Sequence, residues 1–462
     1  MRGIQLQRKS EISLARQIYQ YLRDMMIEGR LRPDEALPST RELAWQLAVS
    51  RNTVCEAYDM LAAEGFIYSQ QGAATRVARG LHLGKNGIPQ SVEPEVVQRP
   101  EILADFRTGR PDLQRFPHQT WLQLLHRNAE KMPLYQWGYT GPAGWPKLRE
   151  EIAAWLFRSR GMAINMRDVF ITAGATQALH LLSELLLAEE QGIVVEDPCH
   201  MGMLRVLQSK KAKVLPIPVD EHGIQTQLLE DNQGCTVYVT PSHQFPLGGI
   251  LPASRRADLI RFARRNDGYV IEDDYDSEFR YQGAPVAPLH ALDPQRVIYV
   301  GTFSKIMFPA LRIGYVILPQ PLQSRWCYLR IHNDVQNPPF EQAALAEYLE
   351  TRKLDRYVQK MRRLYGQRRR ILLDTLTEVF GDAWKPWGDA AGLHLAVQFP
   401  GRHFTRDFAL KAKEKGLLVT PAGNHRVISS IHSDKLLLGY GHLEENNIRE
   451  GILLLGDFLQ NI

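Results

Sequence analysis

Two short apolar runs, each leading into residues that carry chemistry, constrain the fold of this chain more than any other feature. Residues 269–271 lead into the acidic segment 272–278, and residues 297–300 lead through a small turn to Lys305. Short runs of this kind are typical of buried strands, and functional side chains gather at the carboxyl ends of parallel strands. The two runs are spaced as in a βαβ unit. The sequence therefore predicts an α/β domain with a mainly parallel sheet.

The residues after the second run suit a ligand that carries both a carbonyl group and a phosphate. The amine of Lys305 can form a Schiff base with an aldehyde, and Thr302 and Arg312 can hold a phosphate. A lysine that ends a strand is usually structural, however. This run alone does not distinguish a binding site from an ordinary strand end.

The acidic segment after the first run supplies a second motif. Pyridoxal 5′-phosphate (PLP) needs an anion against its pyridinium nitrogen and a donor near its phenolate oxygen. Asp273 and Tyr275 are placed to supply these two groups. A solvated acidic loop is the ordinary alternative. The order strand, acid, strand, lysine favours a PLP site in which Lys305 is the Schiff-base residue.

At this point the chain shows a resemblance to a known family. Residues from about 103 to 460 resemble the fold-type I aminotransferases. The segments Thr240–Gly248 and Glu272–Phe279 resemble more specifically the MocR/GabR regulators, a branch of the GntR family in which an aminotransferase-like domain follows a winged helix-turn-helix. The resemblance implies a PLP-dependent transferase fold with a mainly parallel central sheet, a smaller C-terminal α/β part from about residue 345, and a head-to-tail homodimer.

The front of the chain supports the same interpretation from its own residues. Residues 13–29 have the apolar period of a helix that ends at a glycine. Ser39 and Glu42 form a capping box for a second helix, and Ser50 caps a third helix that ends at Gly65. Three short helices with a tight turn before the last one predict a helix-turn-helix.

Two β-like pieces, 66–68 and 75–77, follow the third helix and are joined through Gly72, which suits a wing. The order resembles the GntR-type DNA-binding domain, whose sequence pattern is matched nearly throughout. It departs at two turns, residues 33–35 and residues 72–75. The second departure is expected to stiffen the tip of the wing.

The candidate DNA contacts lie at the start of the third helix, because a recognition helix meets base edges with its N-terminal residues. These are Arg51, Asn52 and Thr53, with Ser50 at the cap, and the family resemblance adds Arg41. Arginine can grip guanine through two hydrogen bonds, whereas short hydroxyls usually hold phosphates. The alternative is a set of ordinary surface residues on a helical bundle. The predicted partner is double-stranded operator DNA.

Length and charge fit a chain of two domains. A chain of 462 residues exceeds a single ordinary core. We expect a DNA-binding domain at 1–79, a linker at 80–102 and a PLP-binding effector domain at 103–462. Residues 1–79 hold 11 Lys and Arg against 9 Asp and Glu, a balance of +2, and the whole chain carries +5. This modest charge predicts weak non-specific DNA affinity, so tight binding needs dimerisation.

Composition also limits the setting of the protein. No stretch approaches the ~20 apolar residues of a membrane span, and the N-terminus lacks the apolar segment of a signal peptide. The four cysteines lack the spacing of metal ligands, so no metal is expected. A reduced, cytoplasmic compartment fits these features. The cysteines are Cys55, Cys199, Cys235 and Cys327.

The remaining cofactor residues are predicted around a phosphate. Free N–H groups at a helix start favour phosphate, and residues 171–179 run from a strand through a small-residue turn into a helix. The resemblance implies that this turn is the phosphate cup and that a tyrosine of one subunit reaches the phosphate of the other. The cup residues are Gly174, Ala175 and Thr176, with Thr302, Ser304 and Arg312 as further ligands and Tyr139 as the intersubunit tyrosine.

Three departures from working aminotransferases bear on function. His200 stands where a tyrosine or tryptophan commonly stacks on the cofactor ring, and it can also titrate. Phe245 replaces the asparagine of the Asn-Pro-x-Gly motif. Lys435 precedes the last strand, where an arginine normally fixes the substrate carboxylate; it offers a point charge in place of a fork, and Arg426 could stand in.

These residues leave three functional hypotheses. The first is a transcription regulator that binds DNA through 1–79 and PLP through Lys305, and that senses an amine or amino-acid effector. The second is a true aminotransferase with an appended DNA-binding domain; the loss of the asparagine and the arginine argues against it. The third is a regulator for which PLP itself is the signal.

Overall fold

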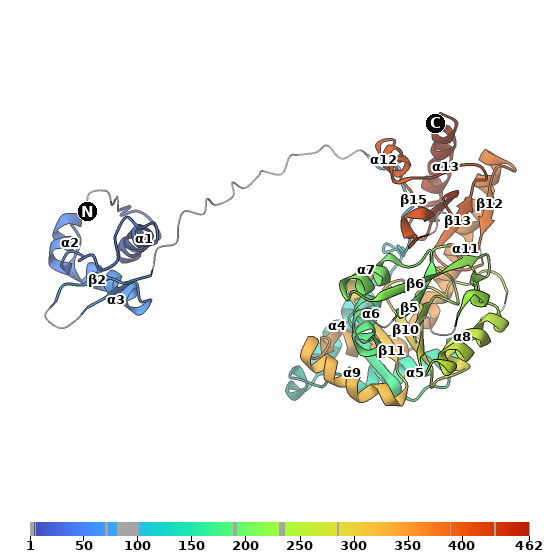
Figure 1. Cartoon of the computed structure of the whole chain (residues 1–462), viewed down its shortest axis with the longest axis horizontal. Coiled ribbons are helices and arrows are strands. Elements are labelled where there is room, and N and C mark those ends of the chain that lie inside the picture. The colour runs from blue at the N-terminus through green and yellow to red at the C-terminus, as the bar shows by residue number, and fades with distance from the viewer. Residues whose placement is uncertain are drawn as a thin grey trace. The chain divides into compact units, whose positions relative to one another are not determined.

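The computed structural model of the chain describes residues 4, 6–69, 73–80, 101–187, 192–230, 236–283, 286–388, 390–428 and 431–461. The chain divides into two compact units, Met1–Val97 and Gln98–Ile462 (Figure 1). The predicted linker, 80–102, lies almost wholly outside the described residues, and Gly72 and Cys235 lie outside them as well.

Unit 1 consists of three helices and a two-stranded antiparallel ribbon. Each helix follows a serine whose hydroxyl accepts a backbone N–H three residues on, at Ser13, Ser39 and Ser50. Ala48 ends the second helix with φ of 50°, so the chain turns sharply into the third. The elements are α1 (Leu14–Ile27), α2 (Thr40–Leu47), α3 (Arg51–Ala63), β1 (Ile67–Tyr68) and β2 (Arg76–Val77). This is the predicted helix-turn-helix with its wing.

The core of unit 1 forms where the apolar stripes of its helices meet. Leu22 of α1, Leu43 of α2 and Leu61 of α3 are fully buried, and Val77 of β2 covers one end. Burying a side chain of this size contributes about 1.5–3 kcal/mol. This core fixes the back of α3 and leaves its N-terminal residues at the surface.

Unit 2 is built on an eight-stranded sheet with the order β4-β11-β10-β9-β8-β5-β6-β7. Within the described residues, all neighbouring strands are parallel except where β11 or the edge strand β7 is involved. The strands are β4 (Val169–Thr172), β5 (Gly192–Asp197), β6 (Lys213–Asp220), β7 (Gly223–Ile224), β8 (Thr236–Val239), β9 (Tyr269–Asp274), β10 (Val297–Thr302) and β11 (Gly314–Ile317). The predicted fold class is confirmed.

Helices cover both faces of the sheet (Figure 1), and alternating side chains of its strands pack against them. In β10, Ile298 and Val300 join one apolar cluster, whereas Val297 and Tyr299 join clusters on the opposite face. Strands buried on both faces read as continuous apolar runs, which is why the sequence revealed them. The covering helices are α4 (His118–Lys131), α5 (Pro146–Arg160), α6 (Ala175–Leu186), α7 (Met201–Ser209), α8 (Ala253–Arg265), α9 (Gln320–Asn333) and α10 (Pro339–Glu350).

The C-terminal part begins with a long helix, α11 (Lys353–Phe380), somewhat after the predicted boundary near 345, which falls inside α10. Its four-stranded antiparallel sheet has the order β12-β13-β16-β15. A second small sheet pairs β14 in parallel with β3, which comes from the start of unit 2. The elements are β3 (Ala104–Asp105), β12 (Lys385–Trp387), β13 (His394–Gln398), α12 (Arg406–Glu414), β14 (Leu417–Leu418), β15 (Thr420–Pro421), β16 (Lys435–Gly439) and α13 (Glu445–Gln460).

Short 3-10 turns complete unit 2: η1 (Leu134–Trp137), η2 (Met166–Asp168), η3 (Thr226–Leu228), η4 (Leu289–Ala291), η5 (Pro309–Leu311) and η6 (Ala422–His425). Within the described ranges, no helix combines the length and the apolarity that crossing a membrane requires.

We predict that Leu22→Ala destabilises unit 1 by about 2–5 kcal/mol, because the substitution leaves a cavity in a closed core. Arg16→Ala, on the exposed side of the same helix, should change stability by less than about 0.5 kcal/mol. Hydrogen exchange of the α1 and α3 amides in the full chain measures both effects. Equal protection in the two variants would contradict the proposed core.

Candidate functional site

A cavity of about 310 Å³ lies in unit 2 at the carboxyl ends of the central strands. Its walls come from the ends of β9 and β10, the starts of α6 and α7, and the loops of the C-terminal part. The lining residues are Thr108, Gly109, Ala175, Thr176, His200, Met201, Thr240, Phe245, Asp273, Tyr275, Thr302, Ser304, Lys305, Arg312, His394 and His425. Most of the residues predicted to hold the cofactor are thus brought together.

Lys305 lies just beyond β10, with its amine inside the cavity. Its Nζ donates a hydrogen bond of 2.8 Å to the carbonyl of Gly109. Burial lowers the pKa of Lys305, although the nearby Asp276 and Asp273 oppose that shift. Gly109 has φ of 73°, and a side chain there would come within 2.8 Å of Nζ. A glycine at this position therefore leaves room for the amine.

Asp273 lies at the end of β9, on the cavity wall. Its Oδ2 accepts a hydrogen bond of 2.8 Å from the Tyr238 hydroxyl, while the buried Oδ1 has no hydrogen-bond partner among the described residues. Burial raises the pKa of Asp273 to about 6. An unpartnered carboxylate oxygen in a buried wall fits a cationic ring nitrogen, since an opposite charge stabilises the ionised carboxylate.

Tyr275 is held in the cavity by a histidine that sequence reasoning missed. The Tyr275 hydroxyl lies 2.9 Å from His243 Nδ1, and the rings stack with centroids 5.6 Å apart. Asp276 Oδ1 lies 2.8 Å from the same nitrogen, and its Oδ2 accepts from the N–H of Leu393. The tyrosine hydroxyl is therefore fixed from behind by a buried polar network.

The predicted phosphate residues converge at one end of the cavity. Gly174 is the N-cap of α6 with φ of 84°, so Ala175 and Thr176 present the helix start to the cavity. Arg312 Nη2 donates to the carbonyl of Ala173 at 2.8 Å and lies so close to Gly174 that a side chain there would clash. A helix N-terminus beside a guanidinium favours an anion.

The phosphate end also includes Thr302 and Ser304. The Thr302 hydroxyl accepts from the N–H of Ser304 at 3.2 Å, and the buried Ser304 hydroxyl has no partner among the residues that the structure describes. A buried hydroxyl without a partner is costly, and a phosphate oxygen would satisfy it.

A buried arginine holds this end of the cavity in place. Arg330 donates to the carbonyl of Ile171 at 2.5 Å and pairs with Asp334 at 2.8 Å. Asp334 in turn accepts from Gln177, whose side-chain oxygen accepts from the N–H of Ala173 at 2.7 Å. This chain of contacts fixes the turn between β4 and α6.

Three imidazoles and Phe245 form one wall of the cavity. Burial lowers the pKa of His200, His394 and His425 to about 4 each, so these imidazoles are neutral at physiological pH. Phe245 makes edge contacts with all three rings. The titration that His200 could undergo in principle is thus moved well below physiological pH by its burial.

Two predicted residues lie away from this cavity. Tyr139 is 87% exposed and does not line it. Lys435 is buried elsewhere: its amine pairs with Asp434 at 2.9 Å and lies 4.2 Å from the centre of the Trp387 ring.

The position of Lys435 corrects the expectation that it faces the effector. Lys435 begins β16, whereas the far end of that strand, Gly439, donates its N–H to Phe106 near the cavity loop. Four residues of strand separate the two ends by about 13 Å. Lys435, at the start of β16, therefore lies at the end of the strand that is remote from the cavity.

Sequence reasoning missed several residues that line the cavity or support it, among them Gly109, His243, Asp276, His394 and His425. His243 and Asp276 lie inside the two segments that carried the family resemblance, so their motifs could have indicated them. Gly109 and His425 come from remote parts of the chain and carry no local signal.

The predicted DNA residues lie on one exposed region of unit 1. Arg41, Ser50, Arg51 and Asn52 are exposed. Thr53 is half-buried; its N–H donates to the capping Ser50 hydroxyl, and its own hydroxyl lies 2.8 Å from the same oxygen. Arg51 Nε lies 3.4 Å from the Thr40 hydroxyl, which links the starts of α2 and α3. Trp45 of α2 is 84% exposed, a feature not anticipated from the sequence.

The departure at 33–35 has a structural explanation. Asp34 adopts the left-handed φ of 64°, a conformation that usually favours glycine. Its carboxylate accepts from the Tyr68 hydroxyl and from Arg79, each at 2.7 Å, and its carbonyl accepts from Arg76. These contacts stabilise the turn and join it to the ribbon.

Comparison with known proteins agrees with this division of the chain. Residues 14–77 match the family "Bacterial regulatory proteins, gntR family", and residues 113–437 match "Aminotransferase class I and II". The chain is 32% identical over 466 residues to the probable rhizopine catabolism regulatory protein MocR of Rhizobium meliloti, covering 97% of this chain and 94% of the relative.

Two further comparisons cover the whole chain and unit 2. The pyridoxine biosynthesis transcriptional regulator PdxR of Corynebacterium glutamicum is 35% identical over 441 residues, covering 95% and 94% of the two chains. The kynurenine aminotransferase of Pyrococcus horikoshii superposes with a TM-score of 0.72 at 27% identity, covering 78% of this chain and 91% of that one.

The chain belongs to the MocR/GabR branch of the GntR family. It is a DNA-binding transcriptional regulator, and the cofactor of its aminotransferase-like domain is PLP. The residues present fit this cofactor, because the unpartnered oxygens of Asp273 and Ser304 and the buried amine of Lys305 match its three functional groups. The cofactor and fold predictions are confirmed, while the role of each residue remains a prediction.

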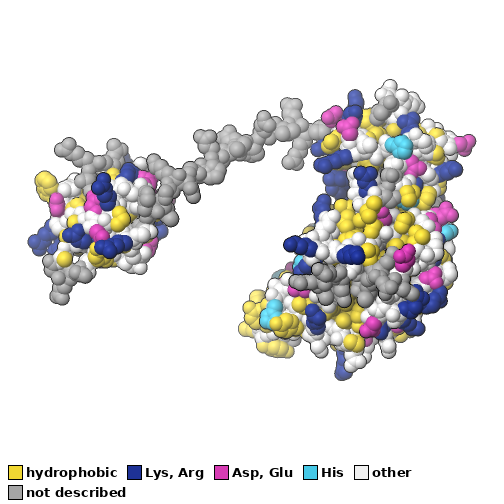
Figure 2. All heavy atoms as spheres, in the orientation of Figure 1, with side chains coloured by type: hydrophobic (Ala, Val, Ile, Leu, Met, Phe, Trp, Pro, Cys, Tyr) yellow, Lys and Arg dark blue, Asp and Glu magenta, His cyan; other side chains and the backbone are white. Residues whose placement is uncertain are grey.

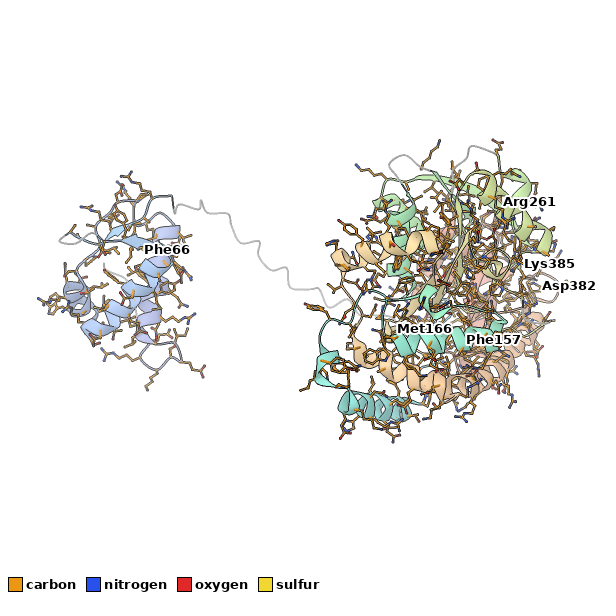
Figure 3. All side chains as sticks on the ribbon, turned by 90° about the horizontal axis from the view of Figure 1, so that it is seen from below. Phe66, Phe157, Met166, Arg261, Asp382 and Lys385 are labelled. Atoms are coloured by element: carbon orange, nitrogen blue, oxygen red, sulfur yellow. The ribbon has the colours of Figure 1, made fainter. Side chains whose placement is uncertain are left out.

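We predict that borohydride reduction links PLP covalently to the wild-type chain and that Lys305→Ala abolishes this link, because Lys305 is the one lysine among the described residues that line the cavity. Mass spectrometry of the reduced protein measures the added cofactor. Lys385→Ala, an exposed lysine of β12 labelled in Figure 3, is the matched control and should be modified like the wild type. Cofactor retained on Lys305→Ala would contradict the assignment.

Proposed function

We propose that unit 2 senses an amine-bearing effector, or PLP itself, and that binding in the cavity changes the affinity of unit 1 for operator DNA. The observation that carries this proposal is the hydrogen bond between Lys305 and Gly109. It joins the residue that would hold the cofactor to segment 101–110, which contains the first described residues of unit 2.

Segment 101–110 is packed into the C-terminal part. β3 pairs with β14, and Phe106 accepts a 2.7 Å hydrogen bond from Gly439 of β16. A change in the position of the Lys305 amine removes a contact of this segment. Such a local difference can shift the populations of two arrangements, provided that the ligand binds them with different affinity.

Different residues of the cavity hold different groups of the cofactor. When bound, PLP supplies an electrophilic carbon to which either the lysine amine or an effector amine can bond. Asp273 holds the ring end by its charge, and Arg312 and the start of α6 hold the phosphate end. The lowered pKa of Lys305 keeps more of its amine uncharged at neutral pH than in a free lysine, and an uncharged amine is the form that reacts.

The uncharged wall formed by the three imidazoles and Phe245 limits which effectors fit the cavity. Among the described lining residues, Arg312 is the one guanidinium, and it lies at the phosphate end. A carboxylate on the effector therefore lacks a two-toothed partner on this wall. An amine without a carboxylate at that position, or PLP itself, fits better. The similarity to PdxR, a transcriptional regulator of pyridoxine biosynthesis, supports the second possibility. An amino-acid effector would need its carboxylate held by a protein side chain outside this wall, such as the exposed Arg426.

The test measures operator affinity of the full chain by fluorescence anisotropy, without ligand, with PLP, and with PLP plus a panel of amines. A change with PLP alone identifies PLP as the signal, and a change that needs an amine identifies amine sensing. Lys305→Ala should lose the response and Lys385→Ala should keep it. An affinity unaffected by every ligand would refute the sensor proposal.

The same assay set distinguishes a working aminotransferase. The fold is shared with such enzymes, but Phe245 occupies the place of the asparagine expected to face the cofactor. Steady multiple turnover of an amino donor with a keto acid would establish the enzymatic alternative. We expect at most residual turnover.

We propose that Arg51, Asn52 and Thr53, with Ser50 and Arg41, contact the operator, and that the protein acts in the cytoplasm, where bacterial operator DNA lies. Arg51→Ala should weaken specific binding by about 1–3 kcal/mol or more, which is roughly 5- to 150-fold, because it removes a contact to a base edge. PLP binding should be unchanged. Arg23→Ala on α1, an arginine paired with Asp24, is the control. Loss of both activities in Arg51→Ala would show that the two units are not separable.

We also propose a homodimer that buries an exposed aromatic surface next to the cavity domain's helix α9. Leu134 is 82% exposed, Tyr135 79% and Tyr139 87%, and loop 138–140 is tied to Gln336 after α9. Figure 2 shows hydrophobic side chains gathered at the corner of unit 2 where α9 lies. A patch of this kind is typical of an interface, and it would carry Tyr139 toward a second subunit.

We predict that Leu134→Glu shifts the protein toward monomer, because it places a charge in the proposed interface. Sedimentation velocity measures the change, and PLP affinity should fall if Tyr139 completes the neighbouring site. Phe157→Glu, at a 63% exposed position on α5 (Figure 3), is the matched control and should leave the assembly intact. A monomeric wild type would contradict the proposal.

A further inference from the structure

Unit 2 contains a second cavity, of about 290 Å³, on the other side of the segment that carries Asp273 and Tyr275. Its walls come from the C-terminal turn of α5, the segment 277–283 and the first half of α11. Phe157, labelled in Figure 3, marks the turn of α5 concerned. The cavity is lined by four arginines: Arg158, Arg160, Arg280 and Arg362.

Positive charge exceeds negative charge in this cavity. Four guanidinium groups line it, against the two carboxylates of Glu278 and Asp355. Arg158 lies 3.5 Å from Asp355, and Arg160 pairs with Asp274 behind the lining, which leaves the carboxylate of Glu278 for Arg280 and Arg362. Burial raises the pKa of Glu278, which favours its neutral form and increases the positive balance.

Several polar atoms of the lining lack a partner. The Nε atoms of Arg160 and Arg280 and the hydroxyl of Ser277 are buried without a hydrogen bond to any described residue. Arg160 is itself only 4% exposed at its side chain. Leaving such donors unsatisfied costs about 1–3 kcal/mol each, and more for charged groups. An oxyanion accepts from several N–H and O–H donors at once and would offset this cost.

The setting of Arg280 gives the cavity room for a ligand. Gly283 has φ of 73°, and a side chain there would come within 3.0 Å of Arg280 Nη2. Arg362 is oriented by its Nε, which donates to the carbonyl of Glu278 at 2.8 Å. Arg362 is thus held by the loop backbone, whereas the glycine at position 283 leaves space around the guanidinium of Arg280.

We propose that this cavity binds a small anion bearing phosphate or carboxylate groups, held by Arg280 and Arg362 with support from Arg160 and Ser277. Its volume of about 290 Å³ is close to the lower limit of small-molecule sites, which suits a small metabolite and exceeds the need of a lone ion. The site is separate from the cofactor cavity, because Lys305 and Arg312 line only the other one.

Occupation of this site would act on the cofactor cavity through a short route. Arg160 pairs with Asp274 at 2.5 Å and reaches Ser242 at 3.3 Å. Asp274 follows Asp273, and Ser242 precedes His243, which holds Tyr275. An anion that draws on the charge of Arg160 therefore changes the surroundings of two cofactor-facing residues.

Calorimetric titration of the PLP-loaded full chain tests the proposal, with inorganic phosphate in one series and malonate in the other. Because PLP already occupies the phosphate end of the first cavity, binding of phosphate or malonate in that cavity cannot produce the measured heat. We expect saturable binding of at least one probe, weakened tenfold or more by Arg280→Gln. The series that saturates distinguishes a phosphate from a carboxylate ligand. Arg356→Gln, an exposed arginine on the same helix α11, is the matched control and should bind like the wild type.

Folding of each variant is checked by its cofactor absorbance and melting temperature, and Arg362→Gln replaces Arg280→Gln if the latter does not fold. The absence of saturable heat with both probes would overturn the proposal. So would binding that both substitutions leave unchanged, since it would show an anion held elsewhere. An effect of Arg280→Gln on operator affinity, without any on phosphate or malonate, would assign these arginines to DNA and also overturn it.

Discussion

The site depends on the burial of five carboxylates within residues 272–278. Taking an ionised carboxylate out of water costs several kcal/mol, so each needs partners. Glu272 accepts from the N–H groups of Leu289 and His290, and Asp274 accepts from Arg160 and Tyr299.

Asp273 carries the fully buried oxygen of this group that has no hydrogen-bond partner among the described residues. Burial raises its pKa to about 6, so the protein alone stabilises its charge poorly. A cationic ring at this oxygen would supply what the wall lacks. The affinity of the site for a cationic ring therefore arises because the protein compensates the buried charge of Asp273 only in part.

The sequence predicted the parts of the fold that local patterns determine. Strands β9 and β10 are buried on both faces, so their apolar runs are visible, and the serine caps of unit 1 mark its three helices. Asp273, Tyr275 and Lys305 could be found because each follows such a run directly. Arg51 and Asn52 could be found because they follow the cap of α3.

The remaining site residues could not be predicted because long-range contacts place them. Gly109 and His425 reach the cavity from loops nearly 200 and 120 residues away from Lys305 in the chain, and no local period marks them. Lys435 shows the converse error. Its residue type suited a carboxylate, but the direction of β16, which places Lys435 at the end remote from the cavity, is set by pairing with β13 and β15 and not by the neighbouring sequence.

The pairing of β3 with β14 determines how unit 2 can be cut. Residues 104–105 lie at the start of the unit in sequence, yet they complete a sheet of its C-terminal end. A fragment that begins after Asp105 would lose that strand and expose the edge of β14, although the reactive lysine lies 200 residues downstream. The smallest autonomous cofactor-binding fragment therefore has to start before Ala104, and chimaeras with other DNA-reading modules need their joint upstream of that residue.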